Sequence, residues 1–167
     1  MEKAMIAEPL KASSFNSPLE AGLRAVSILA AVVPQAFDLQ RLVTLDYLLV
    51  HSGDIGGPSS LHPDLPMRSG ELLVRRQLVE TGLLLMVSRD LVVRHIGKDG
   101  ISYSAHDMAG IFLDSLASEY TKSLRERAEW LAEEFSAATD AEFHARANTV
   151  IEKWAEQFQQ IHMSLGV

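Results

Sequence analysis

The stretch RSGELLVRRQLVETGLLLMVSRDLVVRHIGKDGISYSA, residues 68–105, decides the fold of this chain. Its first half carries apolar residues at helical spacing, and Ser69 is placed to cap the helix that they predict. After Arg89 the apolar residues alternate as in a strand, and Gly97-Lys98-Asp99-Gly100 has the composition of a turn. A long helix followed directly by a β-hairpin is typical of the second half of a winged helix-turn-helix. We therefore expect a helix at 70–89 and strands at 91–96 and 101–104.

The composition indicates one globular domain. The chain has 167 residues, 47% of them hydrophobic, which is enough to bury a core. It contains no cysteine, which excludes disulfides and thiolate metal sites and fits a reducing cytoplasm. The apolar runs near residues 25–33 and 42–50 are shorter than the ~20 residues of a membrane span, and residues 1–15 lack the apolar core of a signal peptide. The net charge of −7 argues against an autonomous nucleic-acid binder, because phosphates repel an acidic body.

Three capping boxes predict where other helices begin. The segments Ser17–Glu20, Ser104–Asp107 and Thr139–Glu142 each place a hydroxyl three residues before a carboxylate. Asp38 is a further cap, and Gly53 is expected to close the helix that Asp38 opens. Besides the helix in the opening stretch, helices are expected at residues 18–33, 39–52, 105–117, 119–137 and 140–162.

These elements predict a mainly α fold: a winged helix-turn-helix-like domain with one β-hairpin and a C-terminal helical extension. We assign residues 1–15 to a flexible N-terminus, 16–118 to the winged-helix-like domain and 119–167 to the extension, which is expected to pack on that domain. Apolar residues of the last expected helix recur at a spacing that favours core packing over a groove for a partner. They are Phe143, Ala147, Val150, Trp154, Phe158 and Ile161.

The residues offer no constellation for catalysis or metal binding. None of the six histidines has the H-x-x-x-H or H-x-x-E spacing that would turn two ligands toward one metal. His51 and Asp54 are close in sequence, but a histidine near the negative end of a helix dipole is the commoner arrangement. Asp46, alone among apolar neighbours, is expected at an exposed rim or bonded to a backbone group. We therefore expect no enzyme activity, no cofactor and no bound metal.

Residues 53–68, GDIGGPSSLHPDLPMR, form a connection that is longer than a compact winged helix normally has. Long ordered loops in small domains are often functional, so this loop is a candidate partner-binding element. A solvated connector is the alternative interpretation. The candidate contact residues are Asp54, Leu61, His62 and Leu65.

The helix–hairpin unit is net positive on a chain that is net negative. Its candidate contacts to a partner or to DNA are Arg68, Arg75, Arg76, Arg89, Arg94 and Lys98. Polar neighbours predict that Arg75 and Arg76 are exposed, and Arg76 is spaced to pair with Glu80. Protein contact is favoured over DNA contact, because so few cations should bind duplex DNA no more tightly than about 10⁻⁵ M at physiological salt.

Four segments carry a resemblance to a known family. They are NSPLEAGLRAVSIL (16–29), DLQRLVTLDYLLVHSGD (38–54), SSLHPDLP (59–66) and RSGELLVRRQLVETGLLLMVSRDLV (68–92). Together they resemble the small middle component of the ABC-three-component systems, bacterial anti-phage defences that include the Lamassu-like systems. The resemblance covers roughly Asn16 to Phe135 and leaves out the helix expected from Asp140 onward.

The resemblance implies a winged-helix-like accessory subunit with no catalytic residues. Such a subunit would act with an ABC/SMC-type coiled-coil ATPase and a separate effector, often a nuclease, and would hold the assembly together. The leading hypothesis is therefore a non-enzymatic, cytoplasmic adaptor that meets DNA only within the complex. A stand-alone winged-helix transcription regulator is the alternative. The neighbouring genes distinguish the two: an ATPase gene and a nuclease-like gene favour the adaptor, and a divergent target operon favours the regulator.

Overall fold

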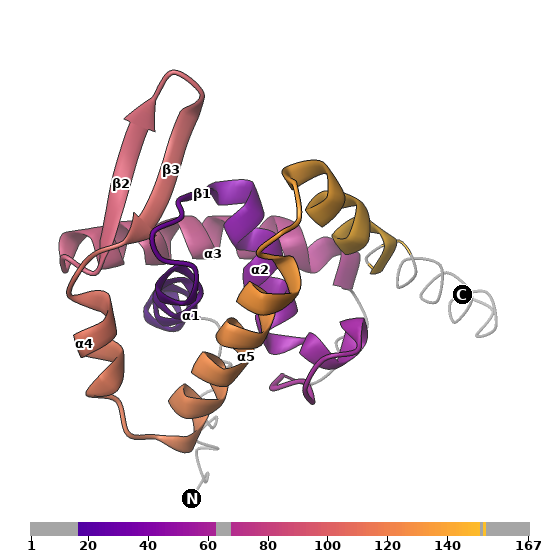
Figure 1. Cartoon of the computed structure of the whole chain (residues 1–167), viewed down its shortest axis with the longest axis horizontal. Coiled ribbons are helices and arrows are strands. Elements are labelled where there is room, and N and C mark those ends of the chain that lie inside the picture. The colour runs from indigo at the N-terminus through magenta and orange to yellow at the C-terminus, as the bar shows by residue number, and fades with distance from the viewer. Residues whose placement is uncertain (1–16, 63–67, 151, 153–167) are drawn as a thin grey trace, which may run out of the picture.

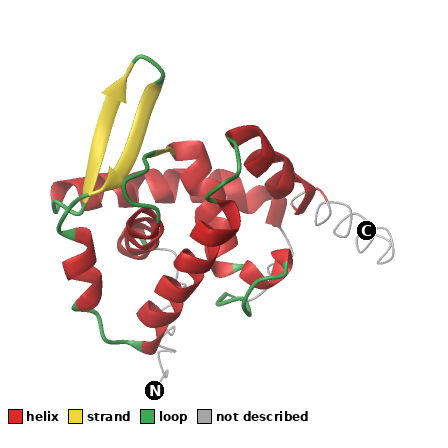
Figure 2. Ribbon diagram, viewed as in Figure 1, coloured by secondary structure: helices red, strands yellow, loops and turns green. Residues whose placement is uncertain are grey.

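The computed structural model describes residues 17–62, 68–150 and 152. This part of the chain is mainly helical, with a small three-stranded antiparallel sheet (Figures 1 and 2). The elements are α1 (Pro18–Ala31), β1 (Phe37–Asp38), α2 (Leu39–Val50), a 3-10 helix η1 (Ser52–Ile55), α3 (Arg68–Ser88), β2 (Val92–Gly97), β3 (Gly100–Ala105), α4 (Ala109–Asp114) and α5 (Glu119–Phe135). A further helix begins at Asp140 and continues through Val150. No helix among the described residues is both long and apolar enough to span a membrane.

The element order from α1 to β3 is consistent with a winged helix-turn-helix-like domain. Strand β3 lies between β1 and β2, with Phe37 paired to Tyr103 and Val92 paired to Ala105. The predicted hairpin is confirmed, and it projects beyond the helices as the wing (Figure 1), defined here as β2, β3 and the turn between them. The sequence prediction missed β1, because two residues are too few to produce a periodic signal.

Helices α1 and α3 approach each other closely at two glycines. A Cβ atom added at Gly82 would lie 2.6 Å from the backbone nitrogen of Gly22 and 2.8 Å from the carbonyl oxygen of Pro18. A Cβ atom at Gly22 would lie 2.9 Å from the carbonyl oxygen of Gly82 and 2.6 Å from Cε of Met86. The absence of side chains at this crossing therefore sets the distance between the two helices.

Local sequence signals explain several helix ends. Ser17 Oγ accepts a hydrogen bond from the Glu20 N–H at 3.2 Å, as its capping box predicts. The Thr139 box is complete: Thr139 Oγ1 accepts from the Glu142 N–H at 3.2 Å, and the Glu142 carboxylate accepts from the Thr139 N–H at 2.9 Å. Asp38 caps α2 by accepting from the N–H of residue 41 at 2.8 Å.

Other predicted ends were wrong. Ser104 does not cap a helix, because β3 continues through Ala105 and α4 begins only at Ala109. Ser69 lies inside α3, which begins at Arg68. Gly53 does not close α2, because His51 is the C-cap and the chain continues into η1. At Ser104, cross-strand pairing along the wing prevails over a local capping signal.

The helix from Asp140 packs against the rest of the domain. Phe143 is buried, and its ring meets that of Phe135 edge to face with 5.1 Å between ring centroids. Ala147, one turn further on, is also buried, so the predicted core stripe is confirmed for these two residues, while Val150 is only half-buried. Its members Trp154, Phe158 and Ile161 lie outside the described residues.

Candidate partner-binding surface

The structure divides the six basic residues of the helix–hairpin unit into two groups. Arg76, Arg89, Arg94 and Lys98 are exposed, and none of the four makes an ion pair with another described residue. This includes Arg76 and Glu80, whose spacing predicted a pair. For Arg68 only the backbone position, at the start of α3, is described.

Arg75 was predicted to be exposed, and this was wrong. It is 5% exposed, and its guanidinium pairs with the carboxylate of Asp46 on α2. Arg24 on α1 pairs with the same carboxylate, with 2.6 Å between Arg24 Nε and Asp46 Oδ1. We call these three side chains the ion triad. Because its members come from α1, α2 and α3, the triad joins the three helices of the winged-helix-like domain.

Asp46 was expected at an exposed rim or bonded to a backbone group, and this too was wrong, because its side chain is 1% exposed and its carboxylate is bonded to two arginine side chains. Burial alone raises the pKa of Asp46, but the positive charges and hydrogen bonds of Arg24 and Arg75 outweigh burial and lower it below its ordinary value. The carboxylate therefore stays ionised inside the protein. The charges of Arg24 and Arg75 also act on neighbouring groups.

The effect of these two arginines extends to the rim of the triad. His62 Nε2 lies 2.8 Å from the Tyr120 hydroxyl, and the two rings stack with 6.3 Å between centroids. Burial and the nearby charges of Arg24 and Arg75 lower the pKa of His62 to about 4. Burial raises the pKa of Tyr120 above its usual value. Both side chains are therefore neutral at pH 7 and form part of the fold.

The loop predicted as a partner-binding element is docked on α5 where it is described. Arg127 donates to the carbonyl oxygen of Ser59 from Nε at 3.0 Å and from Nη2 at 2.6 Å. A Cβ atom at Gly57 would meet the Trp130 ring at 2.5 Å, so the loop lies directly on that ring. The alternative of a freely solvated connector therefore does not hold for residues 52–62.

The three loop candidates that the structure describes are not gathered on one free surface. The backbone N–H groups of Leu61 and His62 both donate to the carbonyl oxygen of Val50, at 2.9 and 3.1 Å. Leu61 is half-buried against the core, and His62 is held by Tyr120 as described above. Asp54 is half-buried in η1. Leu65 lies outside the described residues.

The exposed apolar side chains of α3 and the wing were not predicted. Val74 is 73% exposed and Leu84 47% exposed on α3, while Ile96 and Ile101 are exposed on the wing. The sequence did contain a signal on α3, because Val74 and Leu84 fall outside the apolar stripe that faces the core. We call the exposed residues of α3 and the wing the α3–wing surface. It combines isolated cations with apolar side chains, a mixture that suits a protein partner.

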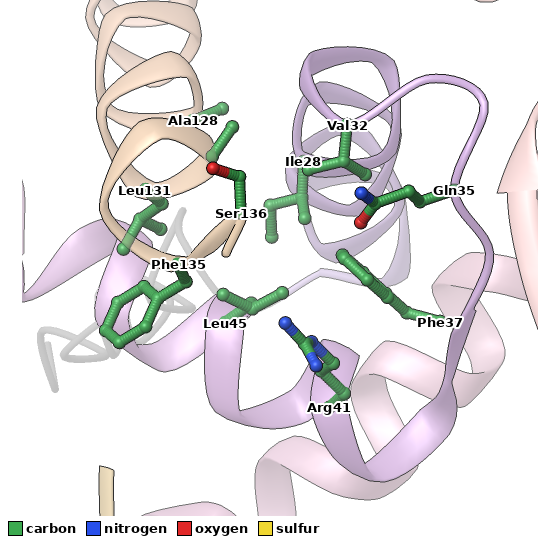
Figure 3. Close-up of a pocket in the computed structure, with 11 residues that line it drawn as sticks. Ile28, Val32, Gln35, Phe37, Arg41, Leu45, Ala128, Leu131, Phe135 and Ser136 are labelled. Atoms are coloured by element: carbon green, nitrogen blue, oxygen red, sulfur yellow. The ribbon is translucent and has the colours of Figure 1, made fainter. Parts of the chain in front are cut away.

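The cavities of the described part are small or open. Figure 3 shows the one between α1, α2 and α5, where Phe37, Arg41 and Phe135 are among the lining residues. Its volume of about 10 Å³ leaves room for at most one water molecule. Arg41 is held there, with its Cζ 4.4 Å from the centroid of the Phe37 ring and 4.6 Å from that of Phe143, and it pairs with Asp140. Among the described residues, no three His, Asp or Glu side chains come together as a metal site would require.

The chain is thus mainly helical with a winged-helix-like arrangement, and it has a mixed basic and apolar face. Comparison with family models gives the class a name. Residues 14–157 match the family described as ABC-three component (ABC-3C) system Middle Component 2, and because the match covers most of the sequence, the chain belongs to that family. The match extends past Phe135 and includes the helix from Asp140, which the sequence resemblance had left out. No curated protein and no solved structure matches the chain.

Proposed function

We propose that this chain is a non-enzymatic adaptor in a cytoplasmic anti-phage defence complex, where it links an ABC/SMC-type ATPase to an effector subunit, often a nuclease. Membership in the Middle Component 2 family supports an accessory role in a multi-component system and therefore protein partners. The linking role and the nature of both partners are our proposal. The observation that carries it is the mixed basic and apolar character of the α3–wing surface.

That surface lies where a DNA-reading winged helix would place its recognition helix and its wing. DNA affinity depends on several cations that meet phosphates, together with polar side chains that reach base edges. Here one of the two adjacent arginines of α3, Arg75, is buried in the ion triad and does not contribute a cation to the surface. Between residues 74 and 105 the four exposed cations stand beside three exposed acids, Glu80, Asp90 and Asp99. These features favour a protein partner over autonomous DNA binding.

The cavities support a role without catalysis. One open hollow, of about 260 Å³, lies between α2, η1, the end of α5 and the helix from Asp140. Its lining is apolar except for Arg146 and Thr149, so it lacks the convergent acid, base or nucleophile of an active site. A binding and positioning function therefore accounts for the described residues more simply than an enzyme does.

Co-expression with the two neighbouring gene products of the system tests the proposal. The expected result is a stable complex of all three chains after affinity purification and size-exclusion chromatography. In parallel, the free chain should bind duplex DNA only at about 10⁻⁵ M or more weakly, and less tightly still as salt rises. Sequence-selective binding by the free chain at about 10⁻⁸ M would support a transcription regulator instead.

A further inference from the structure

The tip of the wing carries an apolar pair that the fold does not use. Ile96 on β2 is paired with Ile101 on β3, and the two side chains are 76% and 40% exposed. Alternation along the strands places them on the same face of the hairpin as Val92 and Tyr103, which are buried at its base. The apolar face of the wing thus continues from the core into solvent.

Basic side chains border this pair. Arg94 lies between Val92 and Ile96 on the same face of β2, and Lys98 lies in the turn immediately beyond. Both are exposed, and neither makes an ion pair with another described residue. Asp99 is the only acidic residue between Val92 and Ala105. The wing is therefore a local basic and apolar surface on a chain whose net charge is −7.

We propose that the wing tip is a docking site for an acidic, amphipathic segment of another protein component of the same system. Ile96 and Ile101 lose water against the apolar side of that segment, and its carboxylates meet Arg94 and Lys98. This inference rests on the proposed adaptor function and specifies which surface of the adaptor binds and what chemistry it recognises. Charge complementarity selects the partner and guides its approach, while the isoleucines supply the buried area.

A DNA partner suits this surface less well. Phosphates are bound by cations and hydrogen-bond donors, so DNA binding would not explain two exposed isoleucines at the tip. The neighbouring helix α3 presents Val74 and Leu84 to solvent, with Glu80 between them. A second copy of the chain, whose α5 exposes several glutamates, is the other possible acidic partner. The experiment below distinguishes both from the proposed one.

A matched pair of variants tests the docking site. Ile96→Ser with Ile101→Ser removes the apolar tip, and Met108→Ser with Ile111→Ser removes another exposed apolar pair, on and just before α4, with exposures of 47% and 64%. Each full-length variant is co-expressed with the other two components, and its affinity for them is measured. The wing variant should bind about tenfold or more weakly, whereas the α4 variant should bind like the wild type.

Charge reversal gives a second measurement. Arg94→Glu with Lys98→Glu should also weaken assembly, and the difference from wild type should shrink as salt rises, because salt screens exposed charges. A photo-crosslinking amino acid at position 96 should join the wing to one of the other components, at a peptide that combines acidic and apolar residues. The same amino acid at position 111 should give no such product.

Different failures have different meanings. If all three chains assemble but the wing variants bind as tightly as wild type, the docking site is wrong and the adaptor function stands. Crosslinking of position 96 mainly to DNA or to a second copy of the chain also overturns the docking site. If the wild-type chain does not assemble with its neighbours at all, the proposed function fails, and this inference fails with it.

Discussion

Arg75 and Arg76 are adjacent in the sequence but belong to two different regions of the molecule. Arg75 is buried in the ion triad, where it pairs with the Asp46 carboxylate that Arg24 also contacts. Arg76 points into solvent on the α3–wing surface and has no ion-pair partner among the described residues. One helical step of about 100° separates a structural charge from one that is free to bind a partner.

The two regions differ in what their charges stabilise. In the triad, both cations are desolvated beside the Asp46 carboxylate, so loss of Asp46 leaves two buried cations without that counter-charge. On the wing, the cations are hydrated and contribute little to folding, so they remain available for binding. Basic residues on one helix therefore cannot be treated as one surface until their burial is known.

The largest effect is expected from Arg75→Glu. The new carboxylate would face Asp46 inside the protein, and Arg24 would be left to compensate both anions. We expect a loss of at least about 3–5 kcal/mol in the free energy of unfolding, measured by urea denaturation. Arg76→Glu is the matched control and should change that free energy by less than about 0.5 kcal/mol. Similar stabilities for the two variants would contradict the division into buried and exposed arginines.

A smaller effect, with an unusual sign, is expected at the glycine crossing of α1 and α3. Alanine normally stabilises a helix relative to glycine by about 0.5–1 kcal/mol. Gly82→Ala should instead destabilise the protein by about 1–3 kcal/mol, because its Cβ would meet the backbone of α1. The control is Gly110→Ala on α4, where a Cβ meets nothing within 4 Å and the normal stabilisation should appear. Thermal unfolding of both variants measures the contrast.

The rim of the triad should respond to pH. The pKa of His62 is about 4 in the folded protein and about 6.5 in an unfolded chain, so unfolding takes up a proton between these values. This group's contribution to stability is therefore fully present above pH 6.5 and is lost as the pH falls toward 4. His62→Gln should reduce the slope of unfolding free energy against pH in that window. An unchanged slope would show that burial and the charges of Arg24 and Arg75 do not hold the histidine neutral.

The smallest effect on stability is expected at the wing. Arg94→Glu with Lys98→Glu reverses two exposed charges, and it should leave the free energy of unfolding within about 0.5 kcal/mol of wild type. Urea denaturation checks this on the same preparation that is used for the binding experiment. A large loss of stability would mean that these cations belong to the fold, as Arg75 does, and would remove the contrast between the two regions.

Much of the fold could be predicted because its signals are local and agree with one another. Helices α1, α2, α3 and α5 were placed within a few residues by apolar period and caps, and the turn Gly97–Gly100 marked the hairpin. The start of α4 was not predictable. Ser104 is a residue type that often caps helices, but the pairing of β3 with β2 keeps Ser104 in a strand. The two-residue strand β1 exists only through its pairing with Tyr103 and Ser102.

The candidate site was harder to predict, because burial of a polar residue depends on partners far away in the sequence. Nothing near Asp46 indicates that Arg24, 22 residues earlier, and Arg75, 29 residues later, will converge on it. Composition does not separate Arg75 from Arg76, but helical spacing does, because Arg75 lies four and eight residues before the buried Val79 and Leu83. The exposure of Ile96 and Ile101 likewise depends on how far the hairpin extends beyond the core.

The glycine crossing has a consequence for the history of this family. Because the backbones of α1 and α3 nearly touch at Gly22 and Gly82, a side chain at either position requires both helices to move apart. Lineages that keep this geometry should therefore retain glycine at both positions, even where the surface residues of α3 and the wing have diverged with their partners. A relative that has gained a larger residue at one position should show compensating changes along the other helix. The pair of glycines is thus a marker for tracing distant members by descent, independent of what each one binds.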